Sequence, residues 1–84
     1  MTGRKPPFDC AIGPEPETVQ NIFSGDSVTI PADAVAIYDV IIGSSMMAEK
    51  STSTKVQAEL YKEVRAGIDW FIQNEPRAYM VLLD

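Results

Sequence analysis

The longest apolar stretch of the chain, AVAIYDVIIGSSMM (residues 34–47), contains no base and a single acid, Asp39. A surface helix ordinarily shows one apolar and one polar face with a period of 3.6 residues. On a helical wheel this stretch shows two apolar stripes, the first formed by Val35, Tyr38, Ile42 and Met46, and the second by Ala34, Ile37, Ile41 and Ala48. A helix that is apolar on most sides is either surrounded by protein or embedded in a membrane.

A membrane span is not expected here. Spanning takes about 20 consecutive apolar residues. Asp39 lies in the middle of the run, and Asp33 and Glu49 lie just outside its ends. We therefore expect this helix to be covered by protein and the chain to make no membrane contact.

Local signals predict three helices. Pro31 suits the first helical position, and Asp33 lies in the first turn, so the first helix is predicted to run from Pro31 to about Ala48. A second helix follows the cluster of serines and threonines at 51–54, any of which can cap it, and ends at Asn74. The Glu75-Pro76 step disfavours helical backbone before the proline, so Pro76 begins a short third helix.

The second predicted helix is amphipathic. Its apolar half comprises Val56, Leu60, Tyr61, Val64, Gly67, Ile68, Phe71 and Ile72, and its other half is charged. Trp70 lies at the edge of the charged half. It either marks a binding surface or packs under the returning third helix, and the second interpretation is the simpler one.

Residues 1–17 differ in composition from the remainder. They contain Pro6, Pro7, Pro14 and Pro16, which favour extended backbone without regular hydrogen bonds. We expect a flexible arm, ordered only through Phe8 and Ile12, that precedes a single small domain over residues 18–84. Residues 28–30 form either a very short strand or the lead into the first helix. The predicted fold class is all-α: two main helices and a short C-terminal helix, with an extended N-terminal arm.

The two stripes of the first helix predict self-association. A chain of 84 residues has a marginal core, and its second and third helices offer too little apolar surface to cover the first on all sides. We expect a two-fold homodimer, in which the stripe of Val35, Tyr38, Ile42 and Met46 faces the chain's own core. The candidate interface residues are Ala34, Ile37, Ile41 and Trp70.

The net charge of −5 comes from the first half of the chain. No base lies between Lys5 and Lys50, whereas seven acids do: Asp9, Glu15, Glu17, Asp26, Asp33, Asp39 and Glu49. Binding of nucleic acid needs clustered Lys and Arg, so direct nucleic-acid binding is not expected. The acidic surface either meets a basic partner or keeps the protein soluble.

Residues that carry chemistry are scarce. The chain has no histidine, no pair of cysteines, no phosphate-binding glycine loop and no nucleophile-elbow motif. Asp39 either pairs with a base in a buried site or reaches solvent along a polar seam, the narrow strip of small and polar residues Ala32, Ala36, Asp39 and Gly43 on the first predicted helix. The second is the more ordinary case. The single Cys10 is interpreted as an incidental thiol. We expect no catalytic residues, no metal ligands and no cofactor.

Two segments, NIFSGDSVTIPADAVAIYDVIIG (21–43) and GIDWFIQNEPRAYMVLLD (67–84), resemble small uncharacterised proteins of marine tailed phages, in particular phages of cyanobacteria. The shared pattern is a turn ending in Ser/Thr-Gly, a helix beginning Ala-Val-Ala-Ile-Tyr-Asp, and a closing Trp-Phe followed by Pro-x-x-Tyr and paired leucines. The chain departs from it at Ile22, where the pattern has proline, and in the serine-rich connection. The resemblance implies a phage source and a similar fold, and it transfers no ligand and no residue role.

These observations predict a non-catalytic protein-interaction module that forms a homodimer. Two alternatives stay open, a structural or assembly component of a phage, and an acidic inhibitor or adaptor that binds a basic host protein. With no apolar segment behind its basic start and one unpaired cysteine, the chain is expected in the cytoplasm, that of the host cell if phage-encoded, or in a virion.

Overall fold

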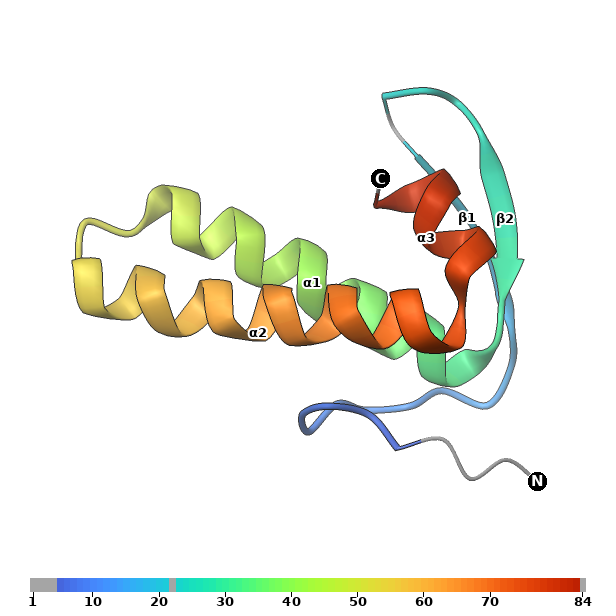
Figure 1. Cartoon of the computed structure of the whole chain (residues 1–84), viewed down its shortest axis with the longest axis horizontal. Helices are drawn as coiled ribbons and strands as arrows, with labels where there is room; N and C mark the ends of the chain where they lie inside the picture. Colours follow the sequence, from blue (N-terminus) through green and yellow to red (C-terminus); the bar gives the residue numbers. More distant parts are fainter. Residues whose placement is uncertain (1–4, 22, 84) are drawn as a thin grey trace.

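The computed structural model describes residues 5–21 and 23–83. Its elements, in chain order, are β1 (Glu17–Gln20), β2 (Ser27–Ile30), α1 (Ala32–Lys50), α2 (Thr54–Asn74) and α3 (Pro76–Leu82). Figure 1 shows α1 and α2 crossing as an antiparallel helical hairpin. The two strands and α3 close the end of the hairpin at which α1 begins, and α3 packs against both α2 and β2. The described chain is therefore mostly helical with a small strand pair at one end.

The all-α prediction is wrong in one respect, because β1 and β2 form a two-stranded antiparallel sheet. Glu17 lies opposite Ile30, and Gln20 lies opposite Ser27. Residues 28–30 are therefore a strand rather than the lead into a helix. Each strand has only four residues, which is too short for a periodic pattern to be recognised in the sequence.

The side chain of Asn21 stabilises the turn between the strands and connects it to α3. Its Oδ1 accepts hydrogen bonds from the backbone N–H groups of Phe23, at 2.8 Å, and Ser24, at 3.3 Å. Its Nδ2 donates to the backbone oxygen of Val81 at 2.9 Å, which ties the turn to α3. Gly25 has φ +82°, a conformation that glycine adopts without a steric penalty. The strand pair is thereby connected to the helical core as well as to itself.

The helix ends lie close to their predicted positions. α1 begins one residue after Pro31, and its first turn contains Asp33, as expected. Ser53 is the cap of α2, since its Oγ accepts a hydrogen bond from the N–H of Val56 at 3.4 Å. Pro76 opens α3 as predicted. The difference is at the end of α1, which continues to Lys50 rather than stopping near Ala48.

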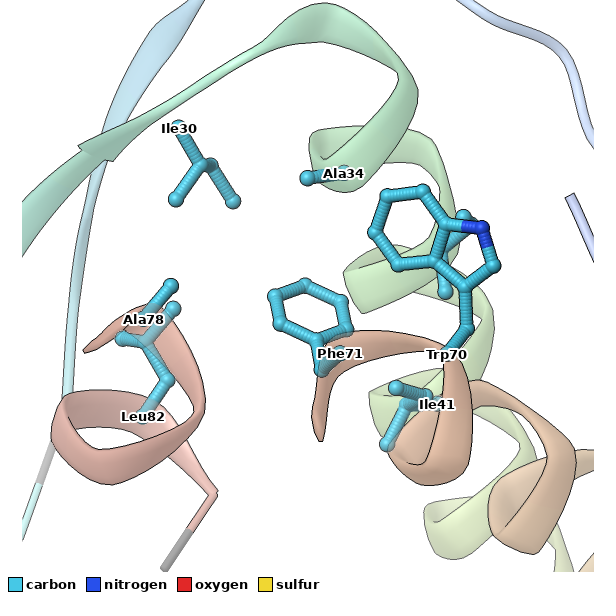
Figure 2. Close-up of a cluster of buried hydrophobic side chains, with 8 residues drawn as sticks. Ile30, Ala34, Ile41, Trp70, Phe71, Ala78 and Leu82 are labelled. Atoms are coloured by element: carbon cyan, nitrogen blue, oxygen red, sulfur yellow. The ribbon is translucent and has the colours of Figure 1, made fainter. Parts of the chain in front are cut away.

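The core lies where the hairpin, β2 and α3 meet. Figure 2 shows Phe71 between the side chains of Ala34 and Trp70 on one side and those of Ile30, Ala78 and Leu82 on the other. The buried cluster consists of Ile30, Ala34, Ile37, Ile41, Trp70, Phe71, Ala78 and Leu82. Aromatic edges add to this packing, because the rings of Trp70 and Phe71 meet edge-on with centroids 5.5 Å apart. All three helices and β2 therefore share one core.

The arm, residues 5–16, has neither helix nor strand. Phe8 packs against the core, as expected, but Ile12 is half exposed and Cys10 packs there instead. In Figure 1 the arm runs along one side of the helical hairpin, and α3 rises on the other side of α2. One side of the hairpin is thus partly covered by the chain's own N-terminal segment.

Candidate functional site

The predicted interface residues of α1 are not on the surface. Ala34, Ile37 and Ile41 are exposed by no more than 2% and belong to the intramolecular core. The prediction that this stripe faces a second copy is therefore wrong, because it is already covered by α2.

The reason is a close approach of the two helices at Gly67. A Cβ atom at Gly67 would lie 2.5 Å from Cγ1 of Ile41, closer than two such atoms can pack. The absence of a side chain at this position lets the stripe of Ile37 and Ile41 seat directly on α2. Gly67 therefore allows the close contact between α2 and the inward stripe of α1.

Trp70, the fourth predicted interface residue, is also buried, with 6% of its surface exposed. Its burial agrees with the packing interpretation, but its indole N–H is not covered by the third helix. Nε1 donates a hydrogen bond to the backbone oxygen of Lys5 at 3.1 Å. Figure 2 shows the indole nitrogen pointing away from Phe71. Trp70 therefore contacts the chain's own arm.

The stripe that was expected to face the interior packs against the core in its first half and is exposed in its second half. Val35 and Tyr38 are half-buried against the core, and Tyr38 meets the ring of Phe71 with centroids 6.5 Å apart. Farther along the same stripe, Ile42 is 39% exposed and Met46 is 54% exposed. This stripe therefore contributes Val35 and Tyr38 to the core, as predicted, and departs from the prediction at Ile42 and Met46.

A matching exposed edge runs along α2. Tyr61 and Ile72 are about half exposed, and they are separated by about three helical turns, so they lie on one face. Ile68, which lies between them on this face, is partly buried against the core. We define the apolar strip as Ile42 and Met46 of α1 together with Tyr61 and Ile72 of α2.

Both halves of the strip lie on the side of the hairpin that the arm does not cover. On α2, Ile72 follows Trp70 by two positions, which turns it by about 200° around the helix and away from Lys5. On α1, the arm lies near Asp33, since the charge of this carboxylate contributes to the raised pKa of Cys10 in the arm. Ile42 lies about 180° around the helix from Asp33. The strip therefore forms a surface of large apolar side chains along one side of the hairpin.

Several polar side chains of the described residues have structural roles. Buried Ser44 donates from its Oγ to Oε1 of Glu63 at 3.1 Å. Gln57 donates from Nε2 to the backbone oxygens of Ala48, at 3.0 Å, and Ser51, at 2.9 Å, which links the end of α1 to the start of α2. Asp39 is exposed, in agreement with a polar seam. No group of three or more potential metal ligands comes together within residues 5–21 and 23–83.

Within residues 5–21 and 23–83, the pKa values of two ionisable side chains are shifted. Burial raises the pKa of the Cys10 thiol above its ordinary value, and the nearby carboxylates of Asp9 and Asp33 raise it further. Burial, followed by the charge of Asp39, raises the pKa of the Tyr38 phenol. Both shifts favour the neutral form of the side chain. Cys10 lacks the thiolate character of a nucleophilic cysteine.

An open hollow lies on the outer surface of α2, beside the strip. It is lined by Ala58, Tyr61, Lys62, Arg65, Ala66 and Asp69. All of these side chains come from a single helix, so the hollow is shallow and has no opposing wall. Small-molecule sites are ordinarily enclosed by several elements, and this hollow does not have that form.

None of the helices in the described part of the chain is long and apolar enough to cross a membrane. Comparisons with protein-family models, with curated proteins and with solved structures find no match to this chain.

Proposed function

We propose that the protein is a non-catalytic protein-interaction module that forms a two-fold homodimer through the apolar strip. The observation that supports the proposal is the exposure of Ile42, Met46, Tyr61 and Ile72 along one side of the hairpin. Contiguous apolar surface of this kind is unusual on soluble monomers and marks interaction sites.

A second copy is the partner that the chemistry of the strip favours. An apolar face is complementary to itself, and a two-fold contact lets one patch cover its own copy. Burial of more surface at an interface would also stabilise the domain, since a chain of this length buries only about 60% of the surface that it exposes when unfolded. The proposed interface replaces the predicted one, with Ile42 in place of its neighbour Ile41.

The test is the mass of the intact protein in solution at micromolar concentration. We expect light scattering to give twice the chain mass of 9.2 kDa. The dimer should persist or strengthen in high salt, because burial of apolar surface is not screened by ions. A mass of 9.2 kDa at micromolar concentration would contradict the proposal.

A second candidate function is an acidic adaptor that binds a basic protein. It is favoured by the absence of bases between Lys5 and Lys50 and by the negative charge that Asp9 and Asp33 place around Cys10. Complexes of that kind associate more slowly and bind more weakly as salt increases. The salt response therefore separates the two candidates.

A phage origin is a further proposal, supported by the resemblance of residues 21–43 and 67–84 to proteins of marine tailed phages. If the protein is encoded by a phage, it acts either in the cytoplasm of the host or as a structural component of the virion. Detection of the chain in purified particles would favour the structural role, and its confinement to the soluble fraction of infected cells would favour the module.

A further inference from the structure

The arm is held on the helical hairpin by side-chain contacts. Residues 5–16 take part in no backbone–backbone hydrogen bond of the described chain. Phe8 and Cys10 pack against the core, and the backbone oxygen of Lys5 accepts the hydrogen bond from Nε1 of Trp70. A segment attached in this way docks on a formed surface rather than extending a helix or a sheet.

The docked segment combines one hydrogen bond with apolar packing. Lys5 is followed by Pro6 and Pro7, which fix the backbone φ angle and have no N–H to donate. The chain then bends at Pro7 and Phe8. Trp70 provides both an apolar ring and an N–H donor. Phe8 then adds a large apolar side chain two residues after the first proline.

The connection between the docked segment and β1 leaves the contact free to exchange. Residues 11–16 are all exposed. Six extended residues span up to about 20 Å. The arm can therefore leave its site without disturbing the strands or the helices. Exchange of an identical segment between two copies costs little, because the same contacts are made in both arrangements.

We infer that Trp70 lies at the centre of a binding site for the Lys-Pro-Pro-Phe segment of the arm, and that the arm of a second copy is its ligand in trans. In the single chain the site holds the chain's own residues 5–8. The inference does not depend on the apolar strip, because Trp70 and Ile72 point to different sides of α2.

Trp70 gives a direct readout, since it is the only tryptophan of the chain. In the full-length Phe8→Ala variant the arm loses its apolar anchor, and we expect the Trp70 emission to shift to longer wavelength. A full-length Trp70→Phe variant has an intact arm and no tryptophan of its own. Adding it in excess should return the Trp70 emission of the first variant to shorter wavelength, with saturation.

The matched control is the Phe8→Ala, Trp70→Phe double variant, which has no aromatic anchor and no tryptophan. An equal shift with this control, or no shift with Trp70→Phe, would overturn the inference. Far-UV circular dichroism checks that each variant keeps its helices. If Phe8→Ala does not, the Pro6→Gly, Pro7→Gly variant takes its place.

Repeating the experiment with Ile42→Glu added to both chains separates this inference from the proposed dimer. We expect the shift to be unchanged. Loss of the shift would show that Trp70 reports contact at the apolar strip, and this outcome would also overturn the inference.

Discussion

At the scale of single residues, two glycines in neighbouring helices have opposite structural roles. A Cβ atom at Gly67 would meet Ile41 at 2.5 Å, whereas one at Gly43 would meet nothing within 4 Å. Gly67 therefore permits the contact between α1 and α2, and Gly43 occupies open space in the middle of α1.

Alanine substitutions should change stability in opposite directions. For Gly67→Ala we expect a loss, because overpacking a core costs about 1–3 kcal/mol and outweighs the gain in helix propensity. For the matched control Gly43→Ala we expect a gain of up to about 1 kcal/mol from helix propensity alone. Urea titrations followed by circular dichroism measure both. A stabilising Gly67→Ala would contradict the close approach of the helices.

At the scale of elements, the ends of the helices could be predicted and their inward faces could not. Pro31, Ser53 and Pro76 act on the backbone beside them, so their effects can be recognised in the sequence alone. The strand pair depends on hydrogen bonds between segments about ten residues apart and on the anchoring of Asn21 to α3. Such pairing leaves little trace in strands of four residues.

For a related reason, local sequence patterns do not show which of the two stripes of α1 faces the core. Both stripes are apolar, so the helix itself does not define its inner face. The inward face also depends on α2, because the absence of a side chain at Gly67 leaves room for Ile41. That glycine lies within the apolar half of the second predicted helix, and its size was the one signal in the sequence that favoured Ile41 over Ile42.

α3 offers a test of packing at this scale. Leu82 is buried in the shared core, whereas Met80, two residues earlier, is exposed. We expect Leu82→Ala to lower the free energy of unfolding by about 2–5 kcal/mol, as is typical of large buried side chains. Met80→Ala should change it by no more than about 0.5 kcal/mol. Equal effects in thermal or urea unfolding would mean that α3 does not pack as described.

At the scale of the whole molecule, the two sides of the helical hairpin differ. The arm lies on one side and brings Phe8 and Cys10 against the core. The other side presents Ile42 and Met46 beside an exposed edge of α2. A small domain with a marginal core and one open apolar side is the basis for the proposed homodimer.

The most direct measurement compares the same charge introduced at two adjacent positions. Ile41 is buried against Gly67, and Ile42 lies in the apolar strip. We expect Ile41→Glu to unfold the chain, because it places an unpaired carboxylate in the core. Ile42→Glu should leave a folded chain that sediments as a monomer while the unsubstituted protein sediments as a dimer. An Ile42→Glu protein that remains dimeric, or an unsubstituted protein that is already monomeric at micromolar concentration, would contradict the account.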